Sequence, residues 1–76
     1  MKEVAITETG DGSKYFLSLP DYSDGFRKSM VERIPATERG WNPEKKQWWV
    51  SAEWLEFAES LIVEFFPHAE VNFYGA

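Results

Sequence analysis

Residues 34–50, which read IPATERGWNPEKKQWWV, decide the fold, and they hold three of the chain's four tryptophans. Asn42-Pro43 favours a turn, because an Asn side chain hydrogen-bonds to its own backbone and Pro fixes the φ angle. Short apolar segments on both sides of this turn predict a β-hairpin. Since alternate residues of a strand point to opposite faces, Trp48 and Trp49 should lie on different faces of the sheet.

The segments before this hairpin predict a first hairpin and a helix. Residues 2–7 and residues 15–19 alternate apolar with polar side chains around a glycine-containing turn, as in an antiparallel pair. Asp21 or Ser23 should cap the helix that follows, and Pro35 should end it. Its apolar side chains recur at every fourth residue, which predicts a buried stripe: Tyr22, Phe26, Met30 and Ile34.

The segments after the central hairpin predict a second helix and a last strand. Ser51 is the expected cap of the helix, and Pro67 ends it. Val71 and Phe73 then alternate with polar neighbours, as in a strand. The predicted order of elements is therefore β-β-α-β-β-α-β.

This order predicts an α+β fold, in which two helices pack on one face of a mostly antiparallel sheet. Trp41 and Trp48 are expected to be buried because of their size and their place in a hairpin, whereas Trp49 lies on the outer face. The complete set of expected core residues is Leu17, Leu19, Phe26, Met30, Ile34, Trp48, Val50, Leu55, Ala58, Ile62 and Phe65.

Length and composition predict one small domain over residues 1–76. The chain has no Cys, so packing must stabilise the fold without disulfides, and no apolar run reaches the length of about 18 residues that a membrane span needs. We therefore expect a soluble, cytoplasmic protein. Residues 27–46 have a net charge of +3, whereas the whole chain has a net charge of -5.

The residue types do not predict catalysis, a metal or a cofactor. His68 is the only imidazole, and no Cys can join it in a metal site. No Ser is placed by the sequence beside a His that could activate it. The expected function is binding, and the protein is not expected to be an enzyme.

Basic and aromatic residues are interleaved in the middle of the chain, a pattern that suits single-stranded or branched DNA. Cations neutralise phosphates, and an indole ring stacks on a base of any sequence. The candidate nucleic-acid-binding residues are Arg33, Arg39, Lys45, Lys46 and Trp49.

The same region resembles a known family, the HARP-like module of annealing helicases. The resemblance covers about residues 15–66 and rests on three parts of the pattern: Tyr22 to Ile34-Pro35, Arg39 with Trp41 to Lys46, and Trp48-Trp49-Val50. It implies recognition of DNA junctions or single strands. Two positions depart from the family pattern: Ala36 replaces the usual Gly, and Gly40 separates Arg39 from Trp41. The sequence contains no Walker A motif, so it does not predict DNA remodelling.

A second class of function stays open, based on the acidic second helix. Its glutamates, which have no partner of opposite sign within the helix, could imitate a row of phosphates and occupy a basic channel of a host protein. Such a protein would be an anti-CRISPR-like or DNA-mimicking inhibitor of a phage or mobile element. The residues involved would be Glu53, Glu56, Glu59 and Glu64. Trp49, Val63 or a free sheet edge could alternatively serve in assembly.

Overall fold

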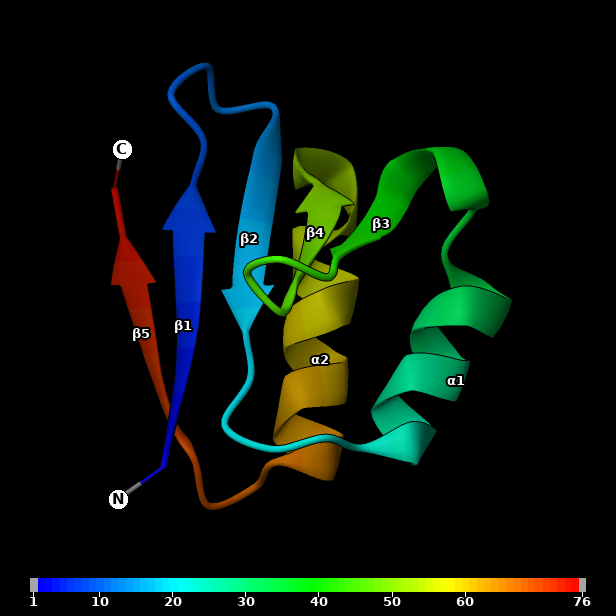
Figure 1. Ribbon diagram of the computed structural model, residues 1–76, viewed down its shortest axis with the longest axis vertical. Helices are drawn as coiled ribbons and strands as arrows, with labels where there is room; N and C mark the ends of the chain where they lie inside the picture. Colours follow the sequence, from blue (N-terminus) through cyan, green and yellow to red (C-terminus); the bar gives the residue numbers. More distant parts are fainter. Residues whose placement is uncertain (1, 76) are drawn as a thin grey trace.

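The computed structural model describes residues 2–75 and confirms the α+β fold (Figure 1). Two helices and five strands follow one another in the expected order. The strands are β1 (Glu3–Glu8), β2 (Lys14–Ser18), β3 (Arg39–Asn42), β4 (Gln47–Ser51) and β5 (Glu70–Tyr74). The helices are α1 (Asp24–Arg33) and α2 (Leu55–Phe65), with short 3₁₀ turns at Ala36–Glu38 and Ala52–Trp54.

The strands form one sheet in the order β3-β4-β2-β1-β5 (Figure 1). The β1–β2 and β3–β4 hairpins are antiparallel, and so is the contact between β2 and β4. The last strand, β5, returns to the far edge and pairs parallel with β1. The sheet therefore has two open edges, one on β3 and one on β5.

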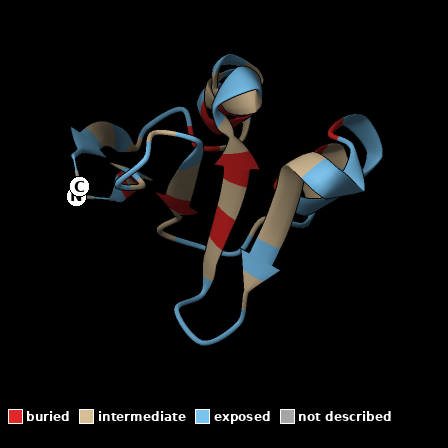
Figure 2. Cartoon of the chain, turned by 90° about the horizontal axis from the view of Figure 1, so that it is seen from above, coloured by how far each residue is buried: buried red, intermediate tan, exposed pale blue. Residues whose placement is uncertain are grey.

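The core lies between one face of the sheet and both helices (Figure 2). The buried residues of the central strands lie on that single face. Register pairs Ile6 with Leu17 and Leu17 with Trp48, and buried residues of the same strand are two positions apart. The buried set is Val4, Ile6, Leu17, Phe26, Met30, Ile34, Trp48, Val50, Ala58, Leu61, Ile62 and Phe66. Three expected core residues, Leu19, Leu55 and Phe65, are only half-buried.

Helix α1 begins at Asp24, two residues after Tyr22, the first residue of the predicted apolar stripe. Ser23 is its N-cap, and the Ser23 hydroxyl accepts a hydrogen bond from the backbone N–H of Phe26 at 3.2 Å. Tyr22 therefore precedes the cap and does not share the helical stripe. The prediction that Tyr22 is buried is wrong, since its side chain is 76% exposed.

Helix α2 also begins later than expected. Ser51 makes no capping bond; its hydroxyl instead donates to a carboxylate oxygen of Glu38. A 3₁₀ turn fills the interval, and α2 begins at Leu55. Neither helix described between residues 2 and 75 is long and apolar enough to cross a membrane.

Candidate nucleic-acid interface

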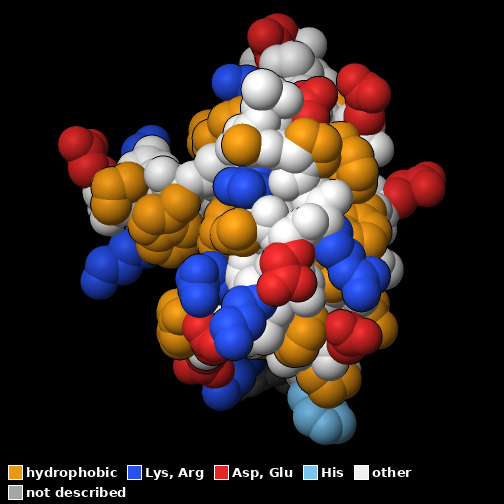
Figure 3. Space-filling model, turned by 90° about the vertical axis from the view of Figure 1, so that its right-hand side faces the viewer, with side chains coloured by type: hydrophobic (Ala, Val, Ile, Leu, Met, Phe, Trp, Pro, Cys, Tyr) orange, Lys and Arg blue, Asp and Glu red, His pale blue; other side chains and the backbone are white. Residues whose placement is uncertain are grey.

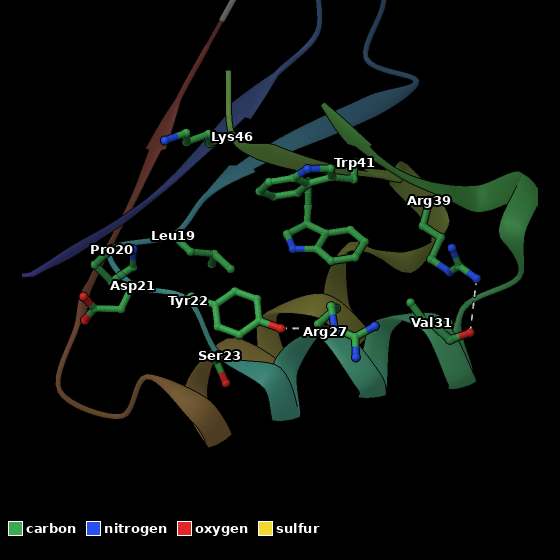
Figure 4. A pocket seen from close by; sticks show the side chains of 11 residues that line it. Leu19, Pro20, Asp21, Tyr22, Ser23, Arg27, Val31, Arg39, Trp41 and Lys46 are labelled. Carbon is green, nitrogen blue, oxygen red and sulfur yellow. Dashed lines mark hydrogen bonds between the residues drawn. The ribbon is translucent and has the colours of Figure 1, made fainter. Parts of the chain in front are cut away.

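A groove separates α1 from the β3–β4 hairpin (Figure 4). It encloses about 690 Å³, within the range of roughly 300–1,000 Å³ that is typical of ligand sites. Its floor and walls are mainly apolar and aromatic, and three cations lie around it. The lining residues are Leu19, Pro20, Asp21, Tyr22, Ser23, Arg27, Val31, Arg39, Trp41, Lys46 and Trp48.

The hairpin places Trp41 at the wall of this groove. Register pairs Trp41 with Trp48 across the two strands, and their rings meet edge to face with centroids 5.4 Å apart. Trp48 is covered from α1 by Phe26, whose ring lies 6.4 Å away. Trp41 is one strand further out, at the edge of the sheet, and it stays 50% exposed. The prediction that Trp41 is buried is therefore wrong, because the helix does not extend over the edge strand.

The opposite wall is formed by Tyr22, which is held by a small polar network. Its hydroxyl donates to Asp24 Oδ1 at 3.0 Å, and Arg27 Nε donates to the same hydroxyl at 3.3 Å. Arg27 also bonds Asp24 directly at 3.1 Å. Hydrogen bonds from Arg27 and then Tyr22 lower the pKa of Asp24, which favours the ionised carboxylate that accepts from both partners. The network fixes an aromatic ring beside a guanidinium at the rim of the groove.

Arg39, at the far end of the groove, donates hydrogen bonds to the end of helix α1. Its Nε donates to the Ile34 carbonyl at 2.9 Å and its Nη2 donates to the Val31 carbonyl at 3.2 Å, as Figure 4 shows for the second bond. These carbonyls lie at the C-terminus of α1, where backbone acceptors lack helical partners. Arg39 thus stabilises the end of the helix, and its charge lies at the groove.

Lys46 reaches the groove from an unusual backbone conformation. It ends the turn of the β3–β4 hairpin with a φ of 54°, in the left-handed region that favours glycine. Lys45, its neighbour, is exposed on the turn, where its N–H bonds Asn42 Oδ1. Lys46 therefore combines a strained backbone conformation with a side-chain cation that lines the groove.

Trp49 lies on the other face of the sheet. A Cβ placed on Gly40 would be 2.1 Å from Trp49 Nε1, so the indole covers the bare backbone of Gly40 at close range. Lys14 Nζ lies 4.4 Å from the centre of the same ring, in a cation–π contact. Trp49 is half-buried as a result. This contact gives a physical reason for the Gly between Arg39 and Trp41.

The structure thus brings together only part of the candidate set. Arg39 and Lys46 line the groove, while Arg33 is exposed on the last turn of α1 and is not a lining residue. On the side of the molecule that carries α1, Lys and Arg side chains lie among apolar and acidic ones (Figure 3). Whether Arg33, Lys45 or Trp49 binds DNA stays a prediction.

The sequence did not assign Tyr22, Arg27 or Trp41 to the site, although all three line the groove. A usable signal for Tyr22 was present, because Ser23 is a strong N-cap and a residue before the cap lies outside the helix. Trp41 could have been questioned because it belongs to the shortest strand, which topology puts at an edge.

The acidic candidates form a separate surface on and before α2. Glu53 lies in the 3₁₀ turn, and Glu56, Glu59 and Glu64 follow on the helix. Glu59 is half-buried and the other three are exposed. Within residues 2–75, none of the four makes an ion pair.

The described part of the chain holds no group of three or more His, Asp or Glu residues that could bind a metal ion. His68 is exposed in the loop between α2 and β5. The groove is lined by aromatic faces, three cations, the Ser23 hydroxyl and one carboxylate, Asp21.

Comparisons of the chain with protein-family models, curated proteins and solved structures give no significant match. The resemblance to the HARP-like module therefore stays a prediction that depends on the sequence pattern.

Proposed function

We propose that this protein is a small, non-enzymatic binding module for single-stranded or branched DNA, and that the groove between α1 and the β3–β4 hairpin is its site. One observation carries the proposal. Two exposed aromatic side chains, Tyr22 and Trp41, line the same groove as three cations.

The aromatic side chains supply the contacts to bases. Stacking of a base on an aromatic side chain contributes about 1–3 kcal/mol and tolerates any sequence, because every base has a π-face. Trp41 offers an accessible indole, and its ring packs against the ring of Trp48 in an edge-to-face contact that holds it in place. In this proposal Trp41 takes the stacking role that the sequence assigned to Trp49.

The cations supply the contacts to phosphates. Lys46 at the hairpin turn and Arg27 on α1 lie on different sides of the groove, so a strand whose base enters it would have cations on both flanks. The rest of the molecule is acidic, with a net charge of -5 for the whole chain. Long-range repulsion of DNA should therefore confine binding to this region and make it weak at physiological salt.

Unpaired nucleotides fit the site better than duplex DNA does. Bases in a duplex stack on one another, so their faces cannot reach an aromatic wall without unpairing. Single strands and the arms of a branched junction offer free bases. The HARP-like resemblance implies the same class of ligand, which supports the proposal without testing it.

The test is a binding titration with a fluorescent single-stranded oligonucleotide at about 50 mM salt, where phosphate contacts are strongest. Wild-type protein should bind the single strand and a splayed fork more tightly than a blunt duplex of the same sequence. Absence of affinity for all three ligands at this salt concentration would refute the proposal.

Lys46→Gly is the most informative variant, because it separates binding from folding. Glycine suits the positive φ at this turn, so the free energy of unfolding should not fall, while the loss of a phosphate contact should weaken binding and reduce the salt slope by about one unit. Lys14→Ala is the matched control: it removes the same charge from the outer face. Equal losses in the two variants would contradict the groove as the site.

The acidic surface of α2 supports a second hypothesis, an inhibitor that binds a host protein. The supporting observation is that its four glutamates have no ion-pair partner in the part of the chain that the structure describes. If wild-type protein has no DNA affinity, Glu56→Lys with Glu64→Lys should abolish binding to such a partner while Lys46→Gly leaves it unchanged.

A further inference from the structure

The two open edges of the sheet differ in length and in the side chains that they carry. Exposed edges commonly carry charged residues, Pro or bulges that discourage pairing with another strand, or they are very short. The β3 edge has four residues, Arg39–Asn42, and its one charge is Arg39. The β5 edge has five residues, Glu70–Tyr74, and its one charge is Glu70. It is the longer edge, and the four residues that follow Glu70 carry no charge and include no Pro.

The backbone of β5 presents hydrogen-bonding groups at this open edge. The N–H of Glu70 donates to the Lys2 carbonyl at 2.9 Å, so Glu70 directs its backbone groups towards β1. Successive residues of a strand alternate in this respect, and Asn72 and Tyr74 therefore also face β1. Val71 and Phe73 direct their N–H and C=O groups outward, where residues 2–75 provide no strand to receive them.

The side chains of the same two residues lie on the helix-bearing face of the sheet. Register pairs Val71 with Val4 and Phe73 with Ile6, both of which are buried beneath the helices. Val71 packs against the core, but Phe73 is 58% exposed. A large aromatic side chain therefore stands beside two unused donors and two unused acceptors.

We propose that two copies of this chain pair through β5, antiparallel, about a two-fold axis at Asn72. In this register Val71 lies opposite Phe73 of the second copy, and the reverse pair forms on the other side of the axis. Both are hydrogen-bonded pairs, in which each residue donates to and accepts from its partner. The pairing continues the sheet from five strands to ten.

Self-complementarity favours a second copy over another partner. An antiparallel pair of identical strands has two-fold symmetry, which is the usual symmetry of dimers. The register centred on Asn72 uses all four outward groups of Val71 and Phe73 in each copy, and it places an aromatic residue opposite a β-branched one, a favourable cross-strand combination. If the axis passed through Val71, Phe73 would lie opposite residue 69, and if it passed through Phe73, Val71 would lie opposite residue 75. Both of these positions are outside β5.

This proposal is independent of DNA binding, because β5 and β3 lie at opposite edges of the sheet. Salt separates the two activities. Each copy carries a net charge of -5, so raising salt from about 50 mM to about 500 mM should strengthen the dimer by screening repulsion, whereas it should weaken DNA binding.

Sedimentation equilibrium over about 10 µM to about 1 mM protein tests the association. Wild-type protein should show a monomer–dimer equilibrium. Phe73→Lys should raise the dissociation constant by about tenfold or more, because an aromatic anchor is replaced by a charge. Val63→Lys, which changes an equally exposed apolar residue on α2, is the control and should associate like wild-type. Circular dichroism checks that both variants fold.

A cysteine placed on the axis tests the register. The chain has no Cys, so Asn72→Cys introduces a single thiol. Residues opposite one another in a non-hydrogen-bonded pair have Cα atoms about 4.5 Å apart, within disulfide range, so this variant should form a covalent dimer on mild oxidation. Glu70→Cys is the control, because its two copies would be about 13 Å apart along the strands.

Three results would overturn the proposal: a monomer at every concentration and salt, a dimer that Phe73→Lys does not weaken, or equal cross-linking of the two cysteine variants. The last two would place any association elsewhere on the molecule.

Discussion

Trp48 and Trp49 are adjacent in β4, yet their surroundings differ completely. Trp48 lies under α1, with 8% of its surface exposed, and contacts Phe26 and Trp41 by ring edges. Trp49 faces away from both helices and covers Gly40 instead. Trp48 is buried because helix α1 covers it, whereas Trp49 is partly buried because Gly40 has no side chain and the indole can lie against its backbone. The alternation of a strand therefore decides the face, while tertiary neighbours decide the exposure.

The two faces of the sheet also differ in the surface that they offer to a ligand. The helix-bearing face ends in a groove, because α1 covers β4 but leaves the edge strand β3 partly open. Trp41 is exposed there beside Lys46. On the outer face, Lys14 lies over Trp49 and limits access to its ring. On the first face a free indole and a cation line a hollow, which is why we propose the binding site there.

The largest expected effect of a substitution is on the helix-bearing face. Trp48→Ala should lower the free energy of unfolding by about 3–5 kcal/mol, because it removes a buried aromatic side chain and leaves a cavity. Urea unfolding followed by circular dichroism measures this loss. Trp41→Ala, half-exposed at the edge, should cost less than half as much; equal losses would show that the two rings are covered alike.

On the outer face, Gly40→Ala should destabilise the protein by about 1–3 kcal/mol, since the new methyl group and the Trp49 indole cannot occupy the same space. The displaced ring should also change the tryptophan fluorescence spectrum of the folded state. Gly10→Ala is the control, because nothing lies within 4 Å of a Cβ at that position. A Gly40→Ala protein as stable as wild-type would mean that the indole moves aside at no cost.

Arg39 links the two regions from the β3 side. Arg39→Met keeps the aliphatic stem but removes the bonds to the Ile34 and Val31 carbonyls, and should cost about 1–2 kcal/mol of unfolding free energy. Arg33→Met, an exposed change without such bonds, should stay within about 0.5 kcal/mol of wild-type. Similar values for both variants in urea unfolding would remove the structural role given to Arg39.

Acid should affect a third place, the β1–β2 turn, and only modestly. Hydrogen bonds from the backbone and hydroxyl of Ser13, with a further one from Thr9, lower the pKa of Asp11 from 3.8 to about 2. The folded state therefore favours the ionised carboxylate. Its contribution is fully present above pH 3.8 and is lost as pH falls towards 2.

Asp11→Asn keeps an acceptor oxygen in this turn but cannot titrate. Its unfolding free energy should consequently fall less steeply than that of wild-type between pH 4 and pH 2, in urea titrations at each pH. Identical slopes for the two proteins would show that the turn does not sense the charge of Asp11.

Patterns of local sequence predicted the elements and the class of fold well, because apolar periodicity reports which side of each element is covered. They placed Trp48 inward and Trp49 outward correctly. They could not predict how far a helix extends over its sheet, and this extent leaves Trp41 exposed. They also gave no partner for the last strand, since the pairing of β5 with β1 joins opposite ends of the chain.

The candidate site was predicted only in part, for the same physical reason. Arg39 and Lys46 were identified from charge and from their neighbourhood to tryptophans, and both line the groove. Tyr22 was wrongly assigned to the core because the four-residue spacing of apolar side chains was continued to a residue that precedes the N-cap, Ser23. Arg27 could not be assigned to the groove before the packing of α1 against the hairpin was known.

The most direct test of the account compares Trp41→Ala with Trp49→Ala in single-stranded DNA binding at about 50 mM salt. If the groove is the site, Trp41→Ala should weaken binding by about ten- to a hundredfold, the worth of one stacked base, while Trp49→Ala stays within about threefold of wild-type. Circular dichroism should show both proteins folded. The opposite order, with Trp49→Ala the weaker binder, would move the site to the outer face and contradict the account.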